Sequence, residues 1–246
     1  MAHSLFISDL HLAAERPGIV EQFFSFVTGP AQGAQALYVL GDLFEYWVGD
    51  DDLDDPLNRS VAQAFAKLAA DGTAVYFMHG NRDLLVGAEF AQRASARLLE
   101  DPTVVDLHGT PTLLMHGDTL CTDDVEYQKF RAYARNPQNQ SRFLALPVPA
   151  RHAEMEALRQ RSESAKQDKS AEIMDVNVEA VERALRQAGY PRLIHGHTHR
   201  PARHVHHVDG HECERWVLGD WYDKGSYLRC DADGCGSITL LRRMRR

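Results

Sequence analysis

Five short apolar segments, each followed at once by a polar cluster, constrain the fold of this 246-residue chain more than any other feature. The segments are residues 5–8, 36–40, 74–78, 112–115 and 193–194, and the clusters read SDLH, GDLF, HGNRD, HGD and HGHTH. Short runs rich in Val, Ile, Leu, Tyr and Phe are typical of strands that are covered on both faces. The sequence therefore predicts buried strands whose ends carry polar side chains.

Helical patterns lie between the first strands. Apolar residues recur at helical spacing over 19–27 and 57–68, and these runs stop at Gly29-Pro30 and near Gly72, which are helix-end signals. Alternating strands and helices predict a layered α/β core. Near the C-terminus, Asp-Gly pairs at 209–210 and 233–234 each separate two alternating runs, so we expect antiparallel hairpins that complete the sheet.

Composition limits the class of protein. With 44% hydrophobic and 25% charged residues the chain is an ordinary globular protein, and its net charge of −8 argues against a nucleic-acid partner. No apolar run approaches the ~18 residues of a membrane span, and MAHSLFISDLHL lacks the basic start of a signal peptide, so we expect a cytoplasmic protein. The four cysteines form no CxxC pair and are expected to be free thiols, with a three-thiol metal site near the C-terminus as the alternative.

The predicted strand ends supply a set of metal-ligand residue types. These are Asp9, His11, Asp42, Asn81, His116, His197 and His199. Ligands of α/β sheets bind at the carboxyl ends of strands, and seven ligands suit two cations rather than one. On an extended strand, the spacing of Asp9 from His11 and of His197 from His199 would place each pair on one face. Each motif alone is weak, since a single His is more often a core or surface residue, but the ordered set is specific.

This ordered set resembles the signature of the calcineurin-like metallophosphoesterases. The resemblance implies a four-layered α/β/β/α sandwich and two divalent ions, of which Mn²⁺ suits the nitrogen and oxygen donors best. It places Asp9, His11, Asp42 and His199 around one ion, and Asp42, Asn81, His116 and His197 around the other. Asp42 would bridge the ions. Catalytic roles would fall on Asp42, Asn81, Arg82 and His116.

One position departs from the pattern of that superfamily, in which most members have His where this chain has Arg82. The His usually helps to protonate or stabilise the leaving oxygen. Arginine cannot donate a proton at neutral pH, but it can hold a phosphate with two hydrogen bonds. A phosphate leaving group needs no proton, because its second pKa is about 6. Arg82 thus suggests a pyrophosphate substrate.

Longer motifs resemble one branch, the UDP-2,3-diacylglucosamine pyrophosphohydrolases of lipid A biosynthesis. They read LFISDLHL, LGDLFEYWVGDDD, HGNRD, LMHGDTLCTDD, AEIMDVN and LIHGHTHRP, and they span most of the chain. The resemblance implies that a dimetal-bound hydroxide attacks the uridine-side phosphorus of UDP-2,3-diacylglucosamine, releasing UMP and 2,3-diacylglucosamine 1-phosphate (lipid X). It also implies an enzyme held peripherally at the cytoplasmic face of the inner membrane. Its substrate contacts would be Asn81, Arg82, Asp124, Ser162, Lys166, Lys169 and His197, although position 166 is often Asn in this branch.

Residues 121–189 are predicted to be a helical insertion over a core of 1–120 and 190–246, with helices at 126–134, 150–164 and 170–188. Residues 129–169 hold nine basic and four acidic side chains. They would attract an anionic substrate or an anionic membrane surface, or they form a solvated helical face. The Arg-rich tail at 242–246 allows the same two readings.

Two further segments are open to more than one interpretation. The uncharged stretch at 143–149 lines an acyl-chain groove or forms the core of a small cap, and the diacylated substrate favours the groove. The aspartates at 50–55 lack the Gly and Glu of a calcium loop and are predicted to form a solvated loop.

Two other functions remain as alternatives to this hydrolase. One is a general metal-dependent phosphodiesterase or nuclease of the same fold, against which Arg82, the basic insertion and the acidic pI argue. The other is a metal-free interaction module on a decayed fold, which should have lost ligands that this chain keeps.

Overall fold

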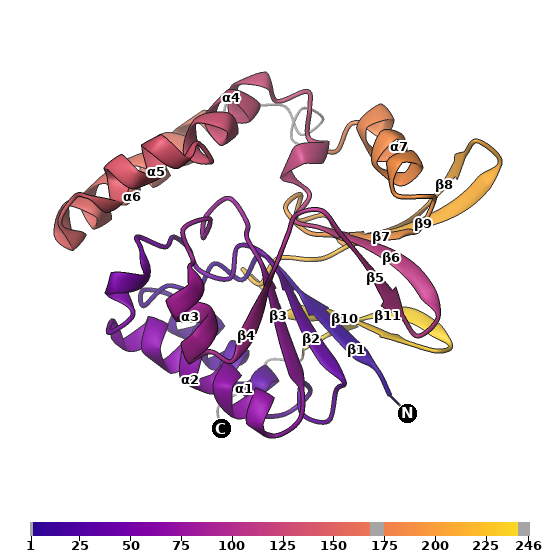
Figure 1. Ribbon diagram of the computed structural model, residues 1–246, viewed down its shortest axis with the longest axis horizontal. Helices are drawn as coiled ribbons and strands as arrows, with labels where there is room; N and C mark the ends of the chain where they lie inside the picture. The colour runs from indigo at the N-terminus through magenta and orange to yellow at the C-terminus, as the bar shows by residue number, and fades with distance from the viewer. Residues whose placement is uncertain (1, 168–174, 241–246) are drawn as a thin grey trace.

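The computed structural model describes residues 2–167 and 175–240, the side chains of 161–167 excepted. Two β-sheets lie face to face, and helices cover both outer sides (Figure 1). The predicted layered α/β sandwich is confirmed. Within the described ranges, none of the helices combines the length and the apolarity that a membrane span requires.

The first sheet contains the strands that begin the chain and those that end it. Its strands are β1 (Ser4–Ile7), β2 (Ala36–Leu40), β3 (Ala74–Met78), β4 (Ala96–Leu99), β10 (Ser226–Asp231) and β11 (Gly234–Thr239). They lie in the order β11-β10-β1-β2-β3-β4. Strands β1 to β4 are parallel, and β10 joins β1 in the antiparallel direction. The carboxyl ends of β1, β2 and β3 therefore meet at one edge.

The second sheet brings the later motifs to the same edge. Its strands are β5 (Thr103–Leu107), β6 (Thr110–Met115), β7 (Arg192–His195), β8 (Ala202–Val208) and β9 (His211–Val217), in the order β5-β6-β7-β9-β8. Strands β6 and β7 are parallel neighbours, with Met115 opposite His195. The HGD and HGHTH clusters therefore leave adjacent strands at neighbouring points.

The helices fall into three groups, as Figure 1 shows. The first sheet is covered by α1 (Pro17–Val27), α2 (Pro56–Ala70) and α3 (Ala88–Arg93), and the second by α7 (Val178–Gln187). A third group stands over the strand ends and consists of α4 (Val125–Ala134), α5 (Pro137–Leu144) and α6 (Val148–Gln167). Short 3₁₀ turns occur at η1 (Asp50–Asp52) and η2 (Asp118–Leu120).

Side chains of the central strands alternate between the layers of the core. In β1, Leu5 and Ile7 pack under the helices of the first sheet. Phe6 lies between the sheets and stacks on Tyr38, with 4.8 Å between ring centroids. Because both faces of this strand are buried, Leu5, Phe6 and Ile7 follow one another as an unbroken apolar run.

The helix nearest the end of the predicted insertion packs on the second sheet. Val181 and Leu185 of α7 join the buried cluster that contains Leu113 and Leu193 of that sheet. The division into a core and an insertion at 121–189 stays a prediction.

Several predicted elements need correction. Strands β4 and β5 and helices α3 and α5 were not expected. The hairpin turn at 209–210 is confirmed, but the second turn lies one residue earlier than predicted, because Asp231 pairs with Gly234. The two hairpins also complete different sheets rather than one, because β9 pairs with β7 while β10 pairs with β1.

The prediction of four free thiols was wrong for two of them. Cys230 and Cys235 face each other in the β10–β11 register and form a disulfide, while Cys121 and Cys213 are buried thiols that take part in no disulfide. The alternative three-thiol metal site was also wrong, since two of its sulfur atoms are bonded to each other. Sequence spacing alone did not reveal that a two-residue turn places these residues in opposite positions.

The acidic segment at 50–55 is not simply solvated. The Asp50 carboxylate accepts the N–H groups of Gly87, Glu89 and Phe90 at the start of α3, at 2.8–3.0 Å, and the indole N–H of Trp47 at 3.1 Å. These bonds satisfy donors that the start of a helix leaves unpaired. The segment is therefore an ordered part of the wall beside the strand ends.

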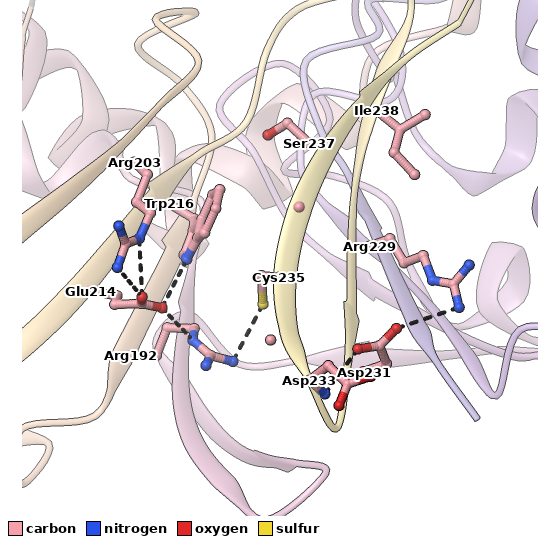
Figure 2. Close-up of a pocket in the computed structure, with 12 residues that line it drawn as sticks. Arg192, Arg203, Glu214, Trp216, Arg229, Asp231, Asp233, Cys235, Ser237 and Ile238 are labelled. Carbon is pink, nitrogen blue, oxygen red and sulfur yellow. Dashed lines mark hydrogen bonds and ion pairs between the residues drawn. The ribbon is translucent and has the colours of Figure 1, made fainter. Parts of the chain in front are cut away.

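A cleft of about 720 Å³ lies between the β10–β11 hairpin and strands β7, β9 and β8 of the second sheet (Figure 2). Glu214 sits between Arg192 and Arg203 and accepts hydrogen bonds from both, and Arg229 pairs with Asp231 at 3.4 Å. Among the described residues, none of the predicted site residues lines this cleft. Each of its three arginines is thus engaged by an acid of the same cleft.

Candidate metal centre and an adjacent apolar cleft

The loops after β1, β2, β3, β6 and β7 bring the predicted ligands together. Side-chain ligand atoms of Asp9, Asp42 and His116 lie within 4.8 Å of one another, and so do those of Asp9, His11 and His199. Asp9, Asp42 and His116 are buried, as is His11. These residues are separated by up to 190 positions in the chain, so the sheets bring them together.

The backbone at these positions is unusual. Five of the seven predicted ligands have a left-handed backbone, with φ of 57° at Asp9, 50° at His11, 53° at Asp42, 69° at His197 and 56° at His199. For residues other than glycine this conformation is uncommon and costs energy, and it concentrates at functional sites. The sequence predicted that Asp9 and His11, and likewise His197 and His199, share one face of an extended strand. This reason was wrong, because β1 and β7 end before these residues.

Asp42 is held from behind by Asp83. The Asp83 carboxylate accepts the N–H groups of Gly80 at 2.8 Å, Asp42 at 3.2 Å and Leu43 at 2.8 Å. The Asp42 carboxylate in turn accepts the N–H of Arg82 at 2.8 Å. Asp83 thus joins two loops and fixes where Asp42 points. It was missed as a functional residue, although the GNRD motif contains it.

Gly80 is the position where the two loops come closest. A Cβ atom at this residue would overlap the carboxylate of Asp42. Only glycine permits that approach, which explains the glycine of the HGNRD cluster.

Asn81, His116 and His197 form one side of the centre. Asn81 Oδ1 lies 3.2 Å from His116 Nε2 and 3.1 Å from His197 Nδ1. His116 Nδ1 lies 2.9 Å from the carbonyl oxygen of Leu40, to which only an N–H can donate. That bond orients the ring and leaves Nε2 to face the site, as in histidine metal ligands.

Asp9, His11 and His199 form the other side. His199 Nε2 lies 3.3 Å from Asp9 Oδ1 and 3.5 Å from His11 Nε2. Asp220 supports His199 from behind, with 3.4 Å between its carboxylate and Nδ1, and the Tyr222 ring stacks on His11. Asp220 and Tyr222 were missed, although Gly219-Asp220 follows β9 much as Gly41-Asp42 follows β2.

The electrostatics of the centre favour positive charge. Burial acts to lower the pKa of His116, but the carboxylates of Asp42, Asp118 and Asp9 raise this pKa to about 9. Burial likewise opposes protonation of His199, yet Asp220 and Asp9 raise its pKa to about 10. Burial and the neighbouring Asp42 carboxylate raise the pKa of Asp83 to about 7. The buried carboxylates therefore require compensating cations.

The residues present fit divalent cations. Asp9 Oδ1 is buried and faces the imidazole nitrogen Nε2 of His199 at 3.3 Å. Carboxylate, amide oxygen and imidazole donors lie on both sides of Asp42, and no thiol is among them. Oxygen and nitrogen donors of this kind are ligands for ions such as Mn²⁺ and Mg²⁺.

An apolar cleft of about 360 Å³ opens beside this centre. Its lining includes Asn81 and Arg82, and it extends to Trp47, Phe130 and Phe143. The core of the sandwich supplies one wall, and α4, α5 and α6 supply the other. The centre and the cleft therefore share Asn81 and Arg82.

The stretch at 143–149 does not form the core of a cap. Phe143 lines the cleft, whereas Leu144 and Leu146 are exposed, and no residue of α4 or α5 is buried. Pro147 and Pro149 lie in the turn between α5 and α6 and at the start of α6, where the missing N–H is harmless.

The remaining predicted substrate contacts are placed as follows. Asp124 begins α4, where its carboxylate accepts the N–H of Tyr127 at 3.1 Å, and the Tyr127 ring lies 5.4 Å from His197. Ser162 and Lys166 lie on α6 at positions whose side chains are not described, and Lys169 lies outside the described residues.

Glu45 was not expected at the site. Its carboxylate lies 2.9 Å from the guanidinium of Arg16 and 3.8 Å from that of Arg82. Its close partner is Arg16, and its contact with Arg82 is an ion pair longer than a hydrogen bond.

The basic surplus of residues 129–169 is largely paired in the described part of the chain. Lys129 pairs with Glu126, Arg131 with Asp118, and Arg159 with Glu156. These acids weaken the positive field that the sequence suggested.

Comparisons with known proteins agree with this architecture. Residues 3–201 match the family model described as calcineurin-like phosphoesterase. The protein named UDP-2,3-diacylglucosamine hydrolase from Aromatoleum aromaticum is 57% identical over 97% of this chain and 96% of its own length. Proteins of the same name from Cellvibrio japonicus and Xanthomonas campestris pv. campestris are 50% and 51% identical, each over 94% of this chain and 96% of the relative. The chain belongs to the calcineurin-like phosphoesterase family, in the branch that these hydrolases represent.

Proposed function

We propose that this protein hydrolyses UDP-2,3-diacylglucosamine to UMP and 2,3-diacylglucosamine 1-phosphate (lipid X). The observation that carries the proposal is that Asn81 and Arg82 belong to the candidate metal centre and also line the apolar cleft. A substrate that joins a pyrophosphate to two acyl chains needs both environments side by side. The names of the relatives point to the same substrate.

The centre would hold two divalent ions, with Mn²⁺ as the preferred metal. Asp9, His11, Asp42 and His199 would hold one, and Asp42, Asn81, His116 and His197 the other. When bound, the pair supplies a polarised water for attack on the uridine-side phosphorus and positive charge for the phosphate oxygens. This assignment is supported by the closeness of His11, His199 and His116 to the two aspartates and by the contacts of Asn81 Oδ1 with His116 and His197 at 3.1–3.2 Å.

Arg82 would bind the pyrophosphate. Its guanidinium can form two hydrogen bonds to phosphate oxygens, and it stays charged throughout. It does not supply a proton, and the departing phosphate of lipid X needs none, because its second pKa is about 6. The Glu45 carboxylate, 3.8 Å from this guanidinium, would attract it by charge.

The acyl chains would lie in the apolar cleft under α4, α5 and α6, which form the cap of the predicted insertion. Phe130, Phe143 and Leu158 provide apolar lining. Asp124, Ser162, Lys166, Lys169 and His197 would contact the polar part of the substrate.

Peripheral binding at the cytoplasmic face of the inner membrane would deliver this lipid substrate. Leu144 and Leu146, at the turn between α5 and α6, are exposed, as are Phe130 and Tyr133 of α4. Exposed apolar side chains grouped beside a lipid-binding cleft are suited to the surface of an anionic bilayer.

The direct test is an assay of UMP release from UDP-2,3-diacylglucosamine with Mn²⁺ present, run beside a chromogenic phosphodiester without acyl chains. We expect turnover of the lipid nucleotide to be far faster. Rapid cleavage of the phosphodiester without UMP release would instead identify a general phosphodiesterase or nuclease.

A further inference from the structure

The cap is attached to the sandwich in an unusual way. Among the described side chains of residues 122–160, Arg151 is the one that is buried, with 2% of its surface exposed. Arginine is almost never fully buried unless its charge is paired. The cap is therefore fixed at this point by a charged side chain rather than by apolar packing.

Arg151 reaches into the loop between β2 and α2. Its guanidinium donates to Asp51 through both terminal nitrogens, one of them at 2.8 Å, and also to the carbonyl oxygen of Val48. Gly49 provides the space, since a Cβ there would overlap the guanidinium and would lie 2.9 Å from Leu144. The neighbouring His152 pairs with Asp52 at 2.8 Å.

The loop that receives Arg151 also forms a wall of the apolar cleft. Trp47 lines the cleft, and its indole N–H donates to Asp50, whose carboxylate in turn accepts N–H groups at the start of α3. The wall is thus rigidly tied to the sandwich. Arg151 connects the start of α6 to it at Gly49, where Leu144, the residue after Phe143, also approaches.

The other end of the cap has its own attachment. Asp118, buried beside the metal centre, accepts hydrogen bonds from Tyr127 at 2.9 Å and from Arg131 at 2.7 Å. The cap is held at both ends, with the cleft between them. Release of either end would alter the width of the cleft.

The Arg151–Asp51 ion pair is weak evidence for stability, because the Asp51 side chain is 59% exposed and ion pairs open to solvent contribute little. Its two-bond geometry does fix position and direction. We propose that Arg151 and Asp51 form a latch that sets the width of the apolar cleft, so that Arg151 is a positioning residue for diacylated substrates. The substrate part of this inference rests on the proposed function.

The test compares Arg151→Gln with wild type on two substrates. For UDP-2,3-diacylglucosamine we expect KM to rise between about 10- and 100-fold, as small misplacements of a binding wall do. For an unacylated chromogenic phosphodiester we expect kcat and KM within about twofold of wild type, because the metal centre is untouched. Lys129→Gln, which removes an exposed ion pair from the same cap, should change neither.

The charge-swapped double variant Arg151→Asp with Asp51→Arg should recover part of the lost affinity. Hydrogen exchange should also accelerate over residues 148–160 in Arg151→Gln, with an unchanged melting temperature for the sandwich.

An unchanged KM for the lipid substrate would overturn the latch, and so would an equal loss on both substrates. If wild type releases no UMP, the proposed function fails, and the exchange measurement still decides the latch: unaltered exchange at 148–160 would refute it.

Discussion

Asp83 is not one of the candidate metal ligands, but it lies behind the candidate metal centre and fixes the position of Asp42. Its carboxylate accepts three backbone N–H groups from the two loops that meet there. An amide in the same place would turn an N–H toward a backbone donor. A buried donor left unpaired costs about 1–3 kcal/mol.

We therefore expect Asp83→Asn to lower the stability by about that amount and to weaken metal binding about 10–100-fold, as loss of support for a ligand does. Urea unfolding and Mn²⁺ titration measure the two effects. Asp106→Asn, which alters a carboxylate that accepts one N–H at a surface turn, is the matched control. Wild-type metal affinity in Asp83→Asn would show that Asp42 does not depend on this support.

At the scale of the elements, the cap contributes a wall to the cleft but almost no buried surface of its own. Helix α5 has no buried residue, and Phe143 faces the cleft. Burial of a large apolar side chain contributes about 1.5–3 kcal/mol. Contact between this wall and an acyl chain should therefore account for a measurable part of the substrate affinity.

Phe143→Asp is expected to raise KM for UDP-2,3-diacylglucosamine by about 10–100-fold, because a carboxylate disfavours acyl chains, and to leave hydrolysis of an unacylated phosphodiester nearly unchanged. Steady-state kinetics on both substrates measures this. Val178→Asp, at an exposed first turn of α7, serves as the control. Equal KM values for Phe143→Asp and wild type would place the acyl chains elsewhere.

At the scale of the whole molecule, the sequence predicted those parts of the fold that are locally encoded. Strands β1 and β2, which are fully buried, and β3, which is mostly buried, have apolar patterns that stand out in the sequence, and the ligand clusters follow them directly. Strands β4 and β5 were missed because their residues are only partly buried and their pairing partners lie elsewhere in the chain. The assignment of strands to two sheets is likewise a tertiary property.

The site was predictable to a similar degree. Its ligand candidates are visible as motifs. Asp220 and Tyr222 instead come from a distant loop, which lies near His11 and His199 because β9 pairs with β7 and β10 pairs with β1. The left-handed backbone of the ligands was not foreseen, because it arises where the strands end and the loops converge. Arg151 was counted as one of many basic residues, and only its burial reveals its role.

The central claim is that one aspartate lies between two cation sites, and counting bound ions tests it most directly. Metal-stripped protein is titrated with Mn²⁺, and bound ions per chain are measured for wild type, Asp42→Ala and the surface control Asp71→Ala. We expect two bound ions per chain for wild type and for the control. For Asp42→Ala we expect both tight metal binding and UMP release to be lost. Two tightly bound ions in Asp42→Ala, or none in wild type, would contradict the account.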